Sequence, residues 1–169
     1  MKRRALATLV LLVAAGALIA TSPPRWSIAH RQGGVVSLAR GEASTRFSLA
    51  ADASHELGVR LRFTPTFSDP TAAAQLRVRT SARGLTTMIP DRILDSSTPD
   101  AGRPWDVDLP YAVTTSPSHL DIDVRIERIS GDQPVSVAWD AEAETGQRGT
   151  SEVPKSASVR IVLASPSGP

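Results

Sequence analysis

The feature that most constrains the fold is a repeated alternation of apolar and polar side chains with a period of two residues. It is clearest at 57–63 and 120–127, where every second residue is Leu, Val, Ile or Phe. This period is typical of half-buried β-strands, because successive side chains of a strand point to opposite faces. The same pattern recurs at shorter and at weaker segments: 46–49, 76–79, 135–140 and 159–163, then 35–39, 85–89 and 107–113.

The segments between these predicted strands are rich in Pro, Gly, Ser, Thr and Asp, which build turns. No segment beyond the N-terminal one keeps a helical period over three turns. Short strands with one polar face each, separated by frequent turns, indicate two packed antiparallel sheets. We therefore expect residues 35–164 to form an all-β domain, an antiparallel immunoglobulin-like β-sandwich of about seven to nine strands, with long loops at 65–74 and 90–106.

The N-terminus has the three parts of a secretory signal. A basic start at 2–4 precedes an uncharged apolar run at 5–20, and small residues and two prolines follow at 21–24. The apolar run is slightly shorter than the roughly 20 residues that a membrane-spanning helix needs. We expect a helical signal peptide over 1–22, with an uncleaved membrane anchor as the alternative. In that case residues 5–20 would be the part of the chain that contacts the membrane.

Export would place the domain in an extracellular or periplasmic position, or at a membrane with the domain facing outside. Pro23-Pro24 and Gly33-Gly34 predict a linker over 23–34. The tail at 165–169 is expected to be disordered. Seventeen arginines against two lysines, with no asparagine, favour a GC-rich gene and hence a bacterial source.

Charge and cysteine content exclude several function classes. The chain has 19 Lys+Arg and 17 Asp+Glu, and three of the basic residues lie in the signal, so the remainder carries 16 positive and 17 negative charges. A nearly neutral domain has no long-range field that would attract nucleic acid, and no nucleic-acid partner is expected. The absence of cysteine excludes a thiolate nucleophile and a thiolate metal site.

Catalytic motifs are sparse. His30, His55 and His119 stand at no metal-binding spacing, and no Gly-x-Ser-x-Gly elbow occurs. We expect no cofactor and name no catalytic residue. A small secreted hydrolase with a site assembled from distant residues stays open as an alternative, because such sites are defined by geometry rather than by sequence order.

Trp105 is the aromatic residue with the clearest binding potential. It ends a predicted loop, and Asp106 and Asp108 follow it closely. An exposed loop tryptophan can stack on a sugar or anchor a protein partner. The other interpretation is a tryptophan that closes one end of the sandwich. A carbohydrate-binding module that uses Trp105 is therefore a second alternative function.

Four arginines point outward from their predicted strands: Arg60, Arg62, Arg77 and Arg79. If the loop at 65–74 joined neighbouring strands, these arginines would form one basic patch. A charged partner could then dock on this patch.

Four carboxylates form the second charge pattern. A hairpin of 120–129 with 134–143 would place Asp123 opposite Asp140 and Asp121 opposite Glu142. Carboxylates directly opposite each other need a counter-charge. An immunoglobulin-like order would supply it from Arg60 and Arg62 as a salt ladder, and a calcium site is the alternative.

Together these observations predict an exported, non-enzymatic β-sandwich. Its expected role is a binding or interaction module for a protein or glycan partner at the cell envelope.

Overall fold

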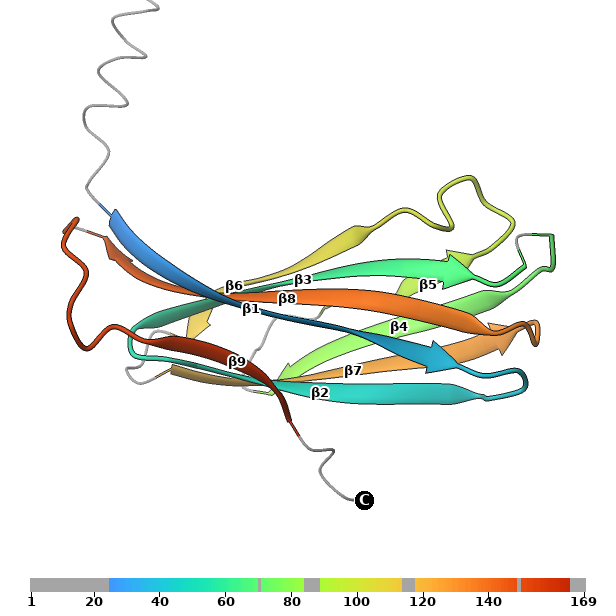
Figure 1. Cartoon of the computed structure of the whole chain (residues 1–169), viewed down its shortest axis with the longest axis horizontal. Helices are drawn as coiled ribbons and strands as arrows, with labels where there is room; N and C mark the ends of the chain where they lie inside the picture. The colour runs from blue at the N-terminus through green and yellow to red at the C-terminus, as the bar shows by residue number, and fades with distance from the viewer. Residues whose placement is uncertain (1–24, 70, 84–88, 114–117, 149, 165–169) are drawn as a thin grey trace, which may run out of the picture.

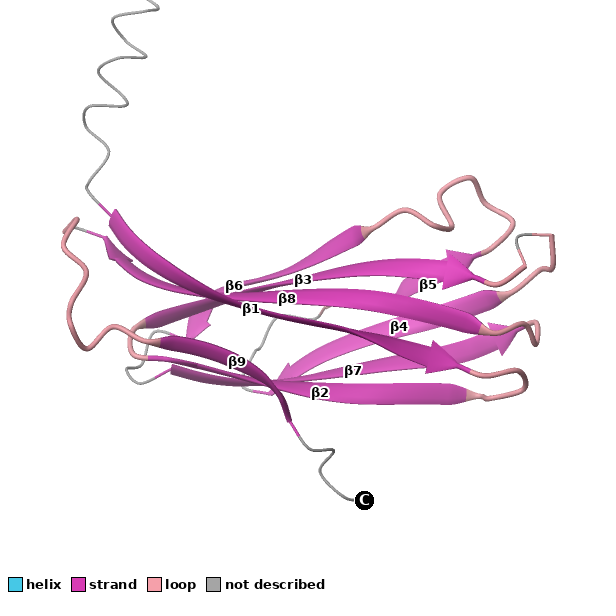
Figure 2. Ribbon diagram, in the orientation of Figure 1, coloured by secondary structure: helices cyan, strands magenta, loops and turns pink. Residues whose placement is uncertain are grey.

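The computed structural model describes residues 25–69, 71–83, 89–113, 118–148 and 150–164. Within these residues the chain consists of strands joined by loops and turns, as Figure 2 shows. The strands are β1 (Arg25–Leu38), β2 (Ser44–Ala53), β3 (Glu56–Phe67), β4 (Gln75–Arg83), β5 (Arg92–Asp95), β6 (Trp105–Val113), β7 (Ser118–Ser130), β8 (Val135–Arg148) and β9 (Val159–Ala164). The predicted all-β class is confirmed. The expected signal helix, the tail at 165–169 and most of the weak strand candidate at 85–89 lie outside the described residues.

The strands form two antiparallel sheets that lie on each other as two layers (Figure 1). Sheet A has the order β1-β8-β3-β6, and sheet B has the order β5-β4-β7-β2-β9. The pairs are nested along the chain, because β1 pairs with β8, β2 with β7, β3 with β6 and β4 with β5. A long two-stranded ribbon gives this nesting when it is rolled over itself, which is the jelly-roll architecture. The ninth strand adds to the free edge of β2.

The core lies between the two sheets and is built from the apolar half of each alternating pattern. Along β3 and β7 every second side chain is buried, in the phase that the sequence predicts. Phe47 of β2 stacks on Trp139 of β8 with ring centroids 4.9 Å apart, which ties sheet B to sheet A. The largest fully buried side chains include Phe63, Leu38, Leu49, Leu57, Leu61, Leu76, Leu120, Ile122, Ile126 and Ile161.

The predicted linker over 23–34 is wrong for its described part. Residues 25–34 belong to β1, which pairs with β8 from Arg25 to Leu38. Trp26 is buried in the core region rather than held in a linker. Gly34 resembles a linker residue in sequence, but its missing side chain leaves room for the ring of Trp139. A Cβ atom at position 34 would lie 2.8 Å from that ring.

The predicted hairpin of 120–129 with 134–143 is also wrong. The strands β7 and β8 belong to different sheets, and the turn between them carries the chain from one layer to the other. Gly131, with a φ of +76°, adopts the left-handed conformation that this turn requires. The Arg128 guanidinium holds the turn by donating hydrogen bonds to the carbonyl oxygens of Gly131 and Gln133, and to those of Ala39 and Glu42 in the neighbouring turn.

We predict that Gly34→Ala destabilises the domain by about 1–3 kcal/mol, because the new methyl group must displace the packed Trp139 ring. Urea unfolding monitored by tryptophan fluorescence measures the change. Gly102→Ala is the matched control, since a Cβ atom at 102 would meet only the carbonyl oxygen of Pro65, at 4.0 Å. Equal stability of the two variants would contradict the packing of Trp139 over Gly34.

Candidate functional site

The outer face of sheet A carries ion pairs between β3 and β6. The Arg60 Nε donates to Asp108 Oδ1 at 2.6 Å. Arg62 forms a bidentate pair with Asp106, through Nε at 2.7 Å and Nη2 at 3.0 Å. The hydrogen bond from Arg62 holds the pKa of Asp106 below its usual value. These pairs are exposed to solvent, so they contribute little to stability.

The same arginines face carboxylates of β8 on their other side. In register, Arg60 lies opposite Glu142 and Arg62 lies opposite Asp140. Arg31 of β1 completes this row and bonds Glu142 at 2.6 Å. Charges of opposite sign therefore alternate across the sheet. We call this set the charge ladder: Arg31, Arg60, Arg62, Asp106, Asp108, Asp140 and Glu142.

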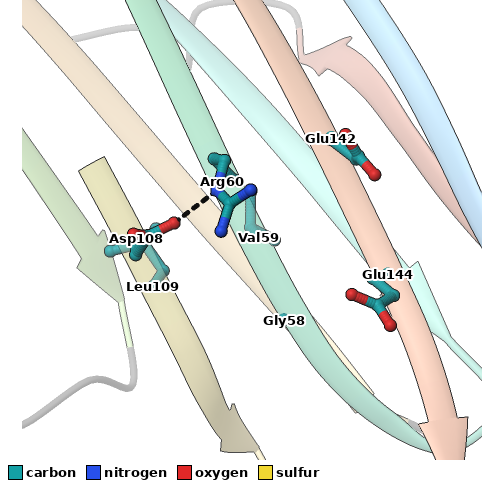
Figure 3. Close-up of a pocket in the computed structure, with 7 residues that line it drawn as sticks. All are labelled: Gly58, Val59, Arg60, Asp108, Leu109, Glu142 and Glu144. Carbon is teal, nitrogen blue, oxygen red and sulfur yellow. Dashed lines mark hydrogen bonds and ion pairs between the residues drawn. The ribbon is translucent and has the colours of Figure 1, made fainter. Parts of the chain in front are cut away.

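A hollow of about 240 Å³ opens beside the charge ladder where Gly58 lacks a side chain. Figure 3 shows Arg60 directed to Asp108 on one side, with Glu142 and Glu144 on the neighbouring strand on the other. Glu144 is bonded by Arg25 at 3.1 Å. The described carboxylates of this hollow thus have arginine partners. The hollow is a space on a surface whose charges are already paired with one another.

The predicted partners of Arg60 and Arg62 need correction. A counter-charge was expected from Asp121 and Asp123, but these residues lie on β7 in sheet B. The reason is the strand order, since β3 lies between β8 and β6 rather than beside β7.

The calcium alternative fails for the same reason. Asp121 and Asp123 are on the outer side of sheet B, and Asp140 and Glu142 are on the outer side of sheet A. The core separates the two pairs, so they cannot share one ion. Among the described residues no group of three or more His, Asp or Glu side chains could hold a metal ion.

Trp105 does not stand free in a loop, as the binding interpretation requires. It is the first residue of β6, and its half-buried ring stacks on Phe63 at 5.0 Å between centroids. The predicted long loop at 90–106 contains the short strand β5. Because one face of the indole is covered by Phe63, Trp105 contributes to the core rather than standing free in a loop. Asp106 and Asp108 point to the opposite side, into the charge ladder.

Arg77 and Arg79 do not share a patch with Arg60 and Arg62. The segment 65–74 leads from β3 in sheet A to β4 in sheet B, so the two pairs of arginines lie on opposite outer faces. Arg79 bonds Asp91 at 3.1 Å. Arg77 lies within 3.8 Å of both Asp91 and Glu127.

The outer face of sheet B holds a larger hollow that the sequence did not reveal. It has a volume of about 440 Å³ and contains four arginines and two carboxylates in its lining. We call it the arginine groove and define it by Arg46, Arg79, Arg83, Arg125, Asp91 and Asp123. Its charged lining carries a net positive charge.

Three of these arginines form a row across neighbouring strands. Arg125 of β7 lies opposite Arg46 of β2 on one side and opposite Arg79 of β4 on the other. Like charges in directly opposite positions destabilise a sheet. Arg79 and Arg125 are compensated in part by Asp91 and Glu127. Arg46 and Arg83 form no ion pair with another described residue.

The carboxylate that lies opposite Arg83 in register bonds another residue. Asp121 lies opposite Arg83 in register, yet it bonds His119 Nε2 at 3.0 Å. The other ring nitrogen of His119, Nδ1, lies 2.7 Å from Asp52 Oδ1. The hydrogen bond to Asp52 is the main cause of a raised pKa of His119, and the bond to Asp121 adds to it. Asp121 therefore bonds His119 and forms no ion pair with Arg83.

The other two histidines also have specific contacts. His30 Nδ1 accepts a hydrogen bond from the backbone N–H of Ile161, which joins β1 of sheet A to β9 of sheet B. His55 packs edge-on against Trp26, with ring centroids 5.1 Å apart. Among the described residues, no helix is both long and apolar enough to cross a membrane.

Comparison with known proteins gives no family. No protein-family model and no curated protein match the chain. Among solved structures it is similar to a chain of the native virion of Kashmir bee virus at acidic pH, with a TM-score of 0.38 and 12% identity over 64% of this chain and 52% of that chain. The decameric BFDV capsid protein gives a TM-score of 0.42 and 8% identity over 71% of this chain and 98% of that one.

A third similar structure is the pentamer of Israel acute paralysis virus, with a TM-score of 0.37 and 14% identity over 68% of this chain and 64% of that chain. This chain spans about half the length of the Kashmir bee virus chain. At these TM-scores the likeness carries no argument about this protein.

We predict that His119 stabilises the domain only while it is charged. Its folded pKa is raised above the unfolded value of about 6.5, so the stabilisation is complete below that value and is lost as the pH rises through the folded pKa. The stability advantage of the parent over His119→Gln should therefore be larger in urea melts at pH 5.5 than at pH 8.5.

A proton NMR titration gives the independent check. The His119 resonance, assigned by its loss in the His119→Gln variant, should titrate above the ordinary histidine value. Titration at or below that value would contradict the paired geometry.

Proposed function

We propose that this protein is an exported, non-enzymatic β-sandwich that acts as a binding module at the cell envelope or outside the cell, and that it binds oxyanions in the arginine groove. The observation that carries the proposal is the row of Arg46, Arg125 and Arg79 on adjacent strands, with Arg83 nearby. Arginine presents a planar set of donors that matches carboxylate, sulfate and phosphate groups. A bound anion would supply the compensation that Arg46 and Arg83 do not find among the described residues.

The charge ladder on sheet A supports the choice of sheet B as the binding face, because the arginines of the ladder already have carboxylate partners. On sheet A the register places each of Arg31, Arg60 and Arg62 beside a carboxylate. A ligand there would have to displace existing ion pairs. On sheet B a ligand anion would relieve repulsion between neighbouring guanidinium groups.

Export is supported by the sequence of residues 1–22, which has the basic start, the apolar run and the small-residue boundary of a secretory signal. The proposed source is a bacterium.

The proposal also covers how far the fold resembles an immunoglobulin-like sandwich. An immunoglobulin-like sandwich places strand B beside E in one sheet and strand C beside F in the other. Here β2 lies beside β7, and β3 lies beside β8. We propose that the likeness to immunoglobulin domains is limited to these four central strands, with the outer strands following the jelly-roll order.

The alternative functions have less support. A sugar would have to approach a Trp105 ring already stacked on Phe63. A hydrolase needs a histidine nitrogen that can accept a proton from its nucleophile. Both ring nitrogens of His119 are held by carboxylates, which leaves neither available for that task. His55 Nδ1 does lie 2.9 Å from Ser54 Oγ, but that hydroxyl also accepts a hydrogen bond from the backbone N–H of Ser158.

The full chain expressed in a bacterium should leave the cytoplasm, and a version that lacks residues 2–22 should stay there. Cell fractionation locates the two forms. Mass spectrometry of the N-terminus then distinguishes a cleaved signal from an anchor. Recovery of the full chain in the cytoplasm alone, with Met1 intact, would refute the export part of the proposal.

The purified exported chain should bind linear hexaphosphate, used as a simple oxyanion probe, in isothermal titration calorimetry. Arg46→Ser/Arg83→Ser should weaken binding about tenfold or more, because hydrogen bonds to charged groups contribute about 1.5–3 kcal/mol each. Arg60→Ser/Arg62→Ser is the matched control, with the same change of net charge on the opposite face. Equal losses in both double variants would refute the assignment to the groove.

A further inference from the structure

The arginine groove contains more than positive charge. The outward row next to Arg46, Arg125 and Arg79 consists of Ser48, Asp123 and Ser81, again on three adjacent strands. Outward residues two apart on a strand are about 7 Å apart, and adjacent strands are about 4.8 Å apart. A ligand about one sugar ring wide would therefore meet oxyanion donors at one end and polar oxygen atoms at the other.

Asp123 is the residue that limits the choice of ligand. Its carboxylate is exposed and lies within 4.0 Å of no arginine nitrogen among the described residues, although four arginines line the same groove. Ser48 Oγ donates to its Oδ1 at 2.5 Å, so one oxygen is positioned by the protein. An ionised carboxylate can only accept hydrogen bonds. A ligand that carries negative charge and no hydrogen-bond donors would bind better to a groove without Asp123.

From these two features we infer that the groove binds an acidic saccharide, whose carboxylate or sulfate meets the arginine row and whose hydroxyl groups donate to Asp123. This inference rests on the proposed oxyanion binding and names the class of ligand. A saccharide has both required groups on one ring: an oxyanion that accepts from guanidinium and hydroxyls that donate to a carboxylate.

An acidic peptide fits the groove less well. Extended peptides bind sheets by pairing with the backbone of an edge strand. The groove lies across the faces of β4, β7 and β2, and β7 at its centre is paired on both sides. A peptide that paired with the open edge of β4 or β2 would therefore lie beside the groove rather than across the arginine row.

Asp123→Ala separates a saccharide from a simple polyanion by the sign of its effect. Binding of hexagalacturonate should become about three- to tenfold weaker, because hydroxyl hydrogen bonds are lost. Binding of hexaphosphate should become about threefold tighter, because a like charge about 7 Å away is removed. Asp108→Ala on sheet A is the control and should change neither affinity. Calorimetry at one fixed salt concentration gives the dissociation constants, and thermal melts confirm that each variant is folded.

Two further probes define the ligand class. A sulfated, carboxylate-free carrageenan hexasaccharide shows whether sulfate or carboxylate is the preferred anion, and binding of either saccharide with the Asp123 dependence supports the inference. Hexaglutamate represents the peptide class, and tighter binding of it than of both saccharides would overturn the inference.

The outcomes also separate this inference from the proposed function. If hexaphosphate binds in the groove but the saccharides do not, or if Asp123→Ala tightens both types of ligand, oxyanion binding stands and the saccharide assignment fails. If none of the anionic probes binds, the proposed function itself fails.

Discussion

The nested pairing of strands is the constraint on which the other features depend. It assigns β3 to the centre of sheet A, between β8 and β6, and β7 to the centre of sheet B, between β4 and β2. The apolar half of each strand then faces the opposite sheet, and the polar half forms one of two outer faces. Which charges become neighbours follows from this order, because side chains on a sheet interact mainly across adjacent strands.

The two outer faces are consequently different surfaces built from the same kinds of residues. On sheet A arginines and carboxylates alternate in register and neutralise each other. On sheet B the register aligns three arginines, and a histidine bonds Asp121, the carboxylate opposite the fourth arginine, Arg83. The difference does not come from composition. It comes from which strands are adjacent. The charges on the outer face of sheet A are paired with one another, whereas the outer face of sheet B is left open to a counter-ion.

The fold class and the inner face of each strand could be predicted from the sequence, because alternation depends on local positions alone. Ile122 and Leu61 are buried in the predicted phase. The partners of a strand could not be predicted in this way, which is why Asp123 was assigned to a hairpin with β8 and why Arg46 and Arg125 were not recognised as neighbours. The role of Gly34 could not be predicted for another reason. In the sequence, a glycine that makes room for a neighbouring tryptophan ring cannot be distinguished from a glycine in a flexible linker.

The pairing of β1 with β8, the outermost pair of the nested set, has a consequence for the order of folding. Arg31 and Glu142, which bond across β1 and β8, are separated by 111 positions along the chain. A ribosome releases β1 first, so this strand has no partner until nearly the whole domain has emerged. Long-range pairings of this kind close late and slowly. We therefore expect β1 to be the last strand of the nested set to be covered. Until then the incomplete domain exposes the edge of β8, the position at which a chaperone or a second copy of the chain would interfere.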